Sequence, residues 1–139
     1  MSAATFHVDL RAAFRTRLAT LAGLPAIAYE GKVADPKVGT PWISESMRPI
    51  SSTVMATGLG GTISHVTMAT LTLHYPSGAG TLTLETMAGL LMEHFRPGTV
   101  LAYESAGAVV TKVERTGLIQ EPDWINGTVI VTLIGHTVN

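Results

Sequence analysis

The sequence predicts an α+β domain in which a mainly antiparallel sheet carries two helices on one of its faces. Apolar residues recur with helical spacing in two separated segments, 6–21 and 81–95. Runs rich in β-branched residues fill much of the remaining chain, most clearly 63–75 and 125–134. The elements therefore follow in the order α, β, β, β, α, β, β, β, and this order favours packing of both helices on one side of the sheet.

Both predicted helices have apolar stripes and recognisable ends. In the first helix, the large apolar residues are spaced by four, four, four and three positions: Phe6, Leu10, Phe14, Leu18 and Leu21. Arg11 and Arg15 fall on the side opposite this stripe. In the second helix, Thr81 is the expected N-cap, and Pro97 follows the last turn because proline cannot continue the helical hydrogen bonds.

The β-rich segments include one long hairpin. Its first strand begins at Trp42, its second covers 63–75, and the small, glycine-rich segment between Pro49 and Thr62 is expected to be its mobile tip. Apolar residues in 63–75 switch phase after Met68, which leaves two alternatives, a bulge or burial of both faces. The closing strand is apolar in both phases as well, so it is either central in the sheet or covered by a neighbouring subunit. Shorter strands are expected at 26–30, 100–103 and 108–115.

The composition points to a single domain that assembles with other subunits. All 139 residues fit within one core, and no stretch has the composition of a linker. Charged residues make up 14% of the chain and hydrophobic residues 46%, whereas an ordinary soluble domain carries about 25% charged residues. We interpret this as apolar surface that neighbouring subunits bury. The alternative is a compact monomer with a threonine-rich surface.

Several classes of protein are disfavoured by what the sequence lacks. The net charge is -1 and no block of like charges occurs, so a nucleic-acid-binding arm is not expected. No apolar run approaches the roughly 20 residues that cross a bilayer, and the first residues do not resemble a signal peptide. The chain has no cysteine, which excludes disulfides and is consistent with synthesis in a reducing cytoplasm.

No motif for catalysis or cofactor binding stands out. The GLGG segment 58–61 lacks the lysine and hydroxyl of a P-loop, and no serine lies in a GxSxG turn. The five histidines form no HExxH motif, and His65 and His74 point to opposite faces of one strand unless a bulge intervenes. Trp42 and Trp124 are expected to anchor the core. We therefore assign no catalytic, cofactor-binding or metal-binding residue and expect no enzyme activity.

Turn-forming and aromatic residues mark the chain at several places. Pro41-Trp42 opens a strand, and the long β run ends in the turn 75–80, Tyr-Pro-Ser-Gly-Ala-Gly. The second helix closes at Phe95 with Gly98, and two further landmarks follow, Gly107-Ala108-Val109 and Asp123-Trp124. Together these landmarks resemble those of the tail terminator-like proteins of tailed phages. The resemblance covers nearly the whole chain, except the segment 51–61 and the residues after Gly135.

The resemblance implies a structural protein of the virion, located at the head-proximal end of the tail and made in the cytoplasm of the bacterial host. Proteins of this kind form a ring, generally a hexamer, that sits on the completed tail tube. The ring stops further addition of tube protein and provides the surface on which the head docks. The implied partners are copies of the chain, the major tail tube protein and the head–tail connector or neck proteins. Phage DNA would pass through the lumen without specific binding, and no membrane or cofactor takes part.

We expect the ring to make its contacts through the long hairpin, especially 48–62, and through the outer face of the closing strand. The candidate interface residues are Arg48, Thr53, Val54, Met55, Leu59, Ile130, Thr132 and Ile134. Rotational symmetry would make each contact between subunits heterologous. Two other functions stay open at this point: a head-completion or neck adaptor between portal and tail, and a small ligand-binding or enzymatic α+β domain with a polar pocket.

Overall fold

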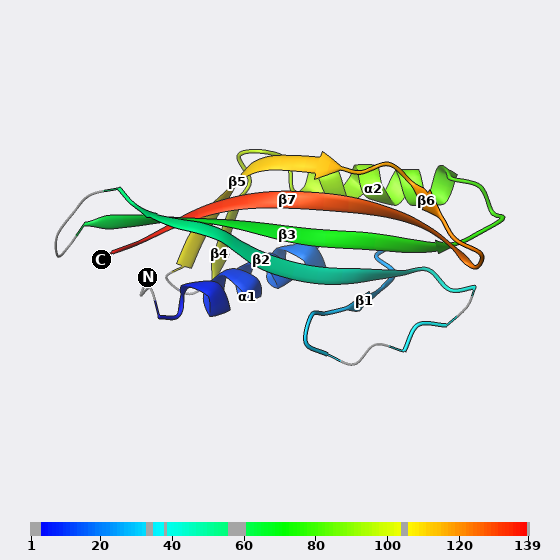
Figure 1. Ribbon diagram of the computed structural model, residues 1–139, viewed down its shortest axis with the longest axis horizontal. Helices are drawn as coiled ribbons and strands as arrows, with labels where there is room; N and C mark the ends of the chain where they lie inside the picture. Colours follow the sequence, from blue (N-terminus) through cyan, green and yellow to red (C-terminus); the bar gives the residue numbers. More distant parts are fainter. Residues whose placement is uncertain (1–3, 33–34, 38, 56–60, 104–105, 139) are drawn as a thin grey trace.

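The computed structural model describes residues 4–32, 35–37, 39–55, 61–103 and 106–138. Within these residues two helices and seven strands follow one another along the chain (Figure 1). Their bounds are α1 (Phe6–Ala19), β1 (Ala26–Ala28), β2 (Trp42–Val54), β3 (Thr62–Pro76), α2 (Leu82–His94), β4 (Val100–Tyr103), β5 (Ala106–Arg115), β6 (Ile119–Gln120) and β7 (Trp124–Val138). No helix in the described part of the chain is long and apolar enough to cross a membrane.

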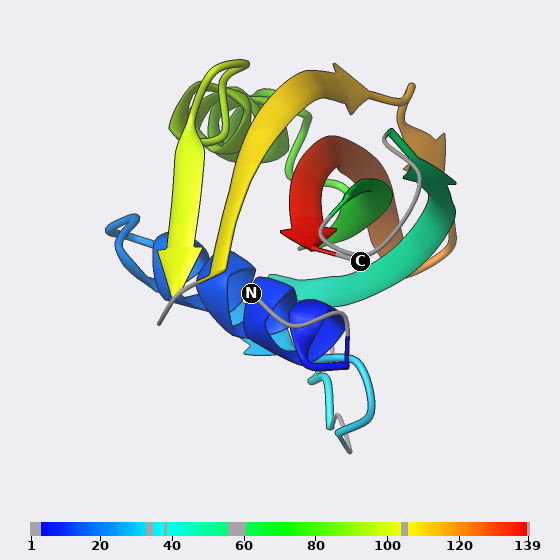
Figure 2. The ribbon, with the colours of Figure 1, turned by 90° about the vertical axis from the view of Figure 1, so that its left-hand side faces the viewer.

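The strands form one curled sheet in the order β1-β2-β3-β7-β5-β4, and the short β6 pairs with β7 beside this path. Only the pairing of β1 with β2 is parallel among the described strands. A view along the sheet shows how strongly it curls, with β5 and β2 bending away from the central strands β3 and β7 (Figure 2). The mainly antiparallel α+β fold predicted from the sequence is therefore confirmed.

One face of the sheet, here called the inner face, packs against both helices. Alternate residues of β3 and β7 point to this face and are fully buried, including Leu71, Leu73, Val129 and Val131. The helices contribute their predicted stripes to the same core, and the rings of Phe14 and Phe95 stack with centroids 4.8 Å apart. Burial of such aliphatic and aromatic side chains is worth about 1.5–3 kcal/mol each.

The phase switch in the long strand does not come from a bulge within that strand, because Val66 and Met68 lie half-buried on the face opposite the core. Pairing of β3 with β7 runs without a register shift from Thr62 to Pro76. The irregularity lies in the neighbouring strand β2, between Pro49 and Ser51. As expected without a bulge in β3, His65 points to the inner face and His74 to the other face.

The hairpin differs from its prediction at the tip. The sequence placed 51–54 in a glycine-rich loop, but these residues continue β2 and pair with 63–66 of β3. The wrong prediction came from composition, because Ser51, Ser52 and Thr53 are small and polar. Pairing with β3 supplies their backbone hydrogen bonds, and such tertiary pairing overrides weak local preference. Residues 56–60 lie outside the described part of the chain.

Candidate assembly surface

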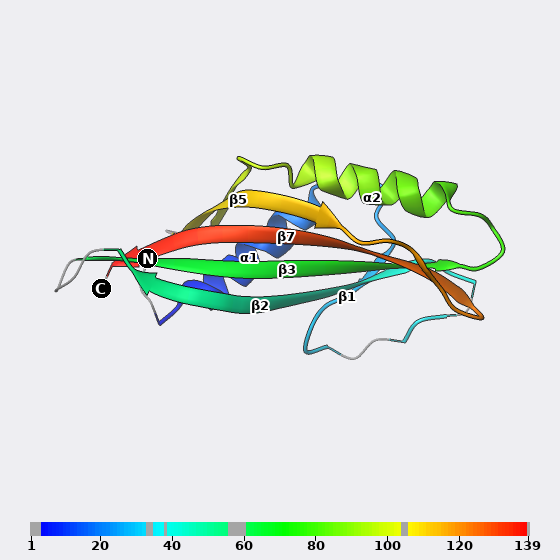
Figure 3. The same cartoon turned by 45° about the horizontal axis from the view of Figure 1, so that its top comes forward.

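The end of the β2–β3 hairpin extends past the helices. In Figure 1 the ends of β2, β3 and β7 continue beyond the first turn of α1, and Figure 3 shows the same from another side. We call residues 50–55 and 62–66 the hairpin arm. Its exposed apolar side chains are Ile50 (45% exposed), Val54 (51%) and Met55 (65%). An apolar projection of this kind is typical of a surface that another protein covers.

The face of the sheet opposite the helices, here called the outer face, is also apolar at its centre. Its cross-strand pairs join aliphatic side chains and threonines of β3 and β7: Val66 with Ile134, Met68 with Thr132, and Thr70 with Ile130. All of these side chains are half-buried although both helices pack on the inner face. The outer face therefore presents a threonine- and aliphatic-rich strip along the two central strands.

The structure brings most of the predicted interface residues onto this outer face. Arg48 is opposite Met68, and Met68 is opposite Thr132, so these three side chains form one row across β2, β3 and β7. Lys112 of β5 continues the row beyond Thr132. Ile130 and Ile134 flank Thr132 on the same strand, and Thr53 reaches the face through its pairing with Ser64. Val54 and Met55 are exposed at the end of the arm, and Leu59 lies outside the described residues.

A buried histidine marks the base of the arm. Ser52 Oγ lies 2.7 Å from His65 Nδ1, and Thr137 Oγ1 lies 2.8 Å from His65 Nε2. The ring of Phe6 stacks on the imidazole with centroids 4.4 Å apart. Burial, followed by the charges of His7 and His136, lowers the pKa of His65 from its ordinary value of 6.5. These contacts tie β2, β3, β7 and the start of α1 together.

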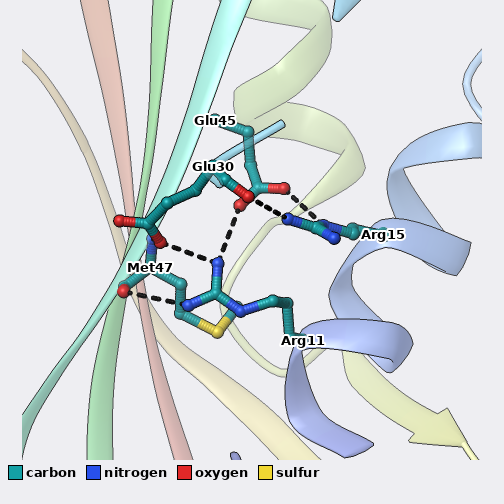
Figure 4. Close-up of polar contacts among 5 residues, drawn as sticks. All are labelled: Arg11, Arg15, Glu30, Glu45 and Met47. Carbon is teal, nitrogen blue, oxygen red and sulfur yellow. Dashed lines mark hydrogen bonds and ion pairs between the residues drawn. The ribbon is translucent and has the colours of Figure 1, made fainter. Parts of the chain in front are cut away.

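A cluster of four charged side chains joins α1 to β2 (Figure 4). Arg15 Nε donates to Glu45 Oε2 at 2.7 Å, and Arg11 Nη1 donates to Glu30 Oε1 at 2.7 Å and to Glu45 Oε1 at 3.5 Å. The carboxylate of Glu45 is fully buried, whereas that of Glu30 is 44% exposed. Glu30 Oε1 also accepts the backbone N–H of Met47 at 3.0 Å, at the free edge of β2. Sequence reasoning missed this cluster.

An aromatic cluster occupies the far end of the outer face. Trp42 stacks on His74 with ring centroids 3.9 Å apart, and Trp124 meets Trp42 edge-on at 6.5 Å. His74 also contacts Asn126 Oδ1 at 2.8 Å, and burial lowers the pKa of this imidazole, partly offset by that hydrogen bond. The prediction that both tryptophans anchor the core is therefore wrong. They were expected inside because they are large and apolar, but strand alternation directs them outward.

Among the described residues, Trp42 Nε1 is shielded from solvent and has no hydrogen-bond partner. A buried indole N–H normally finds an acceptor, because an unpaired buried donor costs about 1–3 kcal/mol. This orphaned donor belongs to the same face as the candidate interface residues.

A groove of about 580 Å³ lies between the start of α2 and the segments before β1 and β2, lined mainly by Leu24, Pro25, Pro41, Leu82 and Met87. Its titratable lining residue is Tyr75, and burial raises the pKa of that phenol. The described residues contain no group of three or more histidine, aspartate or glutamate side chains that could hold a metal ion. The groove thus lacks the convergent polar groups that a substrate pocket needs.

Comparison with known proteins identifies the family. The model of the phage tail terminator protein family matches residues 9–131, which is most of the chain. No curated protein matches the sequence. One solved structure shares the fold with a TM-score of 0.75 and 17% sequence identity, over 96% of this chain and 96% of that chain. On the family match, this chain belongs to the phage tail terminator protein family, whose members are structural components of phage tails.

Proposed function

We propose that this chain forms a ring, hexameric as the resemblance implies, that caps the tail tube, stops its polymerisation and provides the docking surface for the head. The observation that carries the proposal is the threonine- and aliphatic-rich outer face, joined to an exposed apolar arm, on a subunit whose described helices pack on the inner face. Side chains such as Met68 and Ile134 gain from burial by a neighbour at about 25 cal/mol per Å².

In a ring with rotational symmetry, each subunit presents one surface to the neighbour on one side and a different surface to the other. The outer face of β7, with Ile130, Thr132 and Ile134, is the proposed contact between copies. The arm, with Val54 and Met55 at its end, is the proposed contact with the tube protein or the connector.

The remaining partners follow from the same assembly. The ring would sit in the virion at the head-proximal end of the tail, after synthesis in the host cytoplasm. Phage DNA would pass through its lumen without specific binding, in keeping with a net charge of -1. The proposal gives the chain no catalytic step, no cofactor and no membrane contact.

Charge placed at the end of the arm tests this proposal. Met55→Glu changes a side chain that is 65% exposed, so the variant should fold normally. The matched control is Ile119→Glu, which alters a side chain 63% exposed on β6, at the other end of the sheet. A deletion of 52–60 would be less informative, because it removes Ser52 from its contact with buried His65.

Each variant is supplied to a phage that lacks this chain, and tails are imaged by electron microscopy. We expect Met55→Glu to give overlong or headless tails and Ile119→Glu to give normal particles. Normal tails with Met55→Glu would exclude the arm as the tube contact. A neck adaptor would give two different results. Phage lacking this chain would make headless tails of normal length, and the purified protein would bind portal complexes but not isolated tubes.

A further inference from the structure

One imidazole links three strands at the base of the hairpin arm. Ser52 belongs to β2, His65 to β3 and Thr137 to β7, and the two hydroxyl oxygens lie 2.7 and 2.8 Å from the ring nitrogens of the histidine. His65 and Thr137 are buried, and Phe6 closes one side of the ring. The arm is thereby fixed to the last residues of β7 by side chains as well as by backbone pairing.

The irregularity in β2 is what brings Ser52 into this bridge. Met47 points to the inner face, and strict alternation from there would direct residue 52 to the outer face. The register shift between Pro49 and Ser51 reverses the phase, so that Ser52 lies opposite His65 on the inner side. A bulge that re-aims one hydroxyl toward a buried imidazole indicates a specific role for that contact.

The hydrogen atoms of the bridge have one arrangement that satisfies every group. Among the described residues, the hydroxyl of Thr137 has only His65 Nε2 within hydrogen-bonding distance as an acceptor. The hydroxyl therefore donates to Nε2, and Nδ1–H donates to the oxygen of Ser52. Ser52 itself is exposed, so its own hydrogen reaches solvent. This arrangement requires a neutral imidazole.

A second proton on His65 would reverse the hydrogen bond to Thr137. It would bind to Nε2 and donate to the hydroxyl oxygen, and the hydroxyl hydrogen would have to turn away, inside the protein, without another described acceptor. The titratable groups that face His65 are His7 from α1, with ring centroids 5.8 Å apart, and His136 from β7. Their charges oppose a second proton on His65 and help to lower its pKa, while β2 contributes the uncharged Ser52.

We propose that the Ser52–His65–Thr137 bridge is a pH-sensitive latch, which holds the arm to the end of β7 while His65 is neutral and releases it when His65 is protonated. The inference concerns the order of the arm and does not require that the arm contacts a tail tube. The two proposals therefore fail separately.

Hydrogen exchange of the full chain, followed by mass spectrometry, tests the latch. Rates are measured at about pH 7.5 and about pH 5, which bracket histidine titration, and are converted to protection factors to remove the intrinsic effect of pH. We expect protection in peptides that cover the arm to fall by about tenfold or more in acid. Peptides from the centre of β3, around Leu71 and Leu73, should keep their protection.

Two variants show which group responds. His65→Gln retains an amide donor and acceptor but does not titrate, so arm protection should change by less than about twofold between the two pH values. Thr137→Val keeps the titratable imidazole but removes the hydroxyl hydrogen that protonation displaces, so the acid response should shrink. The matched control is His74→Gln at the other end of the sheet, which should respond like the unmodified chain.

Equal arm protection at both pH values in the unmodified chain would refute the latch. The same is true if His65→Gln loses protection in acid as the unmodified chain does. If His65→Gln does not fold, Thr137→Val decides, because an undiminished acid response in that variant would show that the bridge is not the responding element.

Discussion

The ring of Phe6 occupies the space in which a side chain at position 135 would lie. A Cβ atom built on Gly135 would be 2.6 Å from both Cε1 and Cζ of Phe6, well inside van der Waals contact. The missing side chain lets the start of α1 approach β7 closely, and Phe6 is fully buried there. Gly135 is thus required by close packing, as expected for a glycine inside a strand.

Replacing Gly135 by alanine should therefore destabilise the protein. The added methyl group forces Phe6 to move, and such overpacking costs about 1–3 kcal/mol, measured by denaturant unfolding. Gly89→Ala is the control: its Cβ meets nothing within 4 Å, and alanine within α2 should stabilise by about 0.5–1 kcal/mol. Unchanged stability of Gly135→Ala would show that Phe6 has room to relax.

Removal of the buried carboxylate should be costly. In Glu45→Ala, Arg15 and Arg11 lose their shared partner. We expect a loss of about 2–3 kcal/mol in the free energy of unfolding, less than for a fully enclosed pair because both arginines reach solvent. The exposed pair of Lys112 and Glu114 provides the comparison, since Glu114→Ala should cost below about 1 kcal/mol. Equal effects would argue against a structural role for the buried cluster.

Acid should weaken the attachment of Glu30. The backbone N–H of Met47, and then Arg11, lower the pKa of this carboxyl from its ordinary value of 4.5. A lowered pKa contributes stability that is present above 4.5 and is lost as the pH falls through the folded value. Between about pH 5 and about pH 3, Glu30→Gln should therefore lose less stability than the unmodified chain. The control is Glu93→Gln, at an exposed position on α2, which should lose stability in acid as the unmodified chain does. A larger loss of stability in Glu30→Gln than in the unmodified chain would contradict the prediction.

A charge on the outer face should impair assembly without unfolding the subunit. Thr132→Lys places an ammonium group in the row between Arg48 and Lys112. Because the side chain is only half-buried and can extend to solvent, the melting temperature should change little, while ring formation measured by native mass spectrometry should fall. Thr83→Lys, on the exposed side of α2, should leave assembly intact. Normal rings from Thr132→Lys would place the subunit contact elsewhere.

The elements that depend on local pattern could be predicted. The first helix was recognised because Phe6, Leu10, Phe14 and Leu18 recur at helical spacing, and all four are buried. Its predicted end was two residues too late, because Leu21 continues the spacing but lies beyond the last helical residue, Ala19. The closing strand was recognised from its β-branched residues, and its apolar residues in both phases agree with its central place in the sheet.

The relative positions of the candidate interface residues could be predicted only in part. Alternation placed Ile130, Thr132 and Ile134 together, but it gave no indication that Arg48 would lie in the same row. That neighbourhood depends on the register of two strand pairings. The bridge of Ser52, His65 and Thr137 was missed for the same reason. Ser52 and Thr137 are far apart in the chain, and the bulge in β2 decides to which face Ser52 points.

The sequence by itself determined the class of fold, the apolar stripes of both helices and the family, because each depends on the type and spacing of residues that are close together in the chain. Only the tertiary structure decided which polar groups meet. Arg15 is 30 residues from Glu45, and His65 is 72 residues from Thr137. Such pairs form only when strand register and helix placement are fixed together, and no local preference of either residue specifies its distant partner.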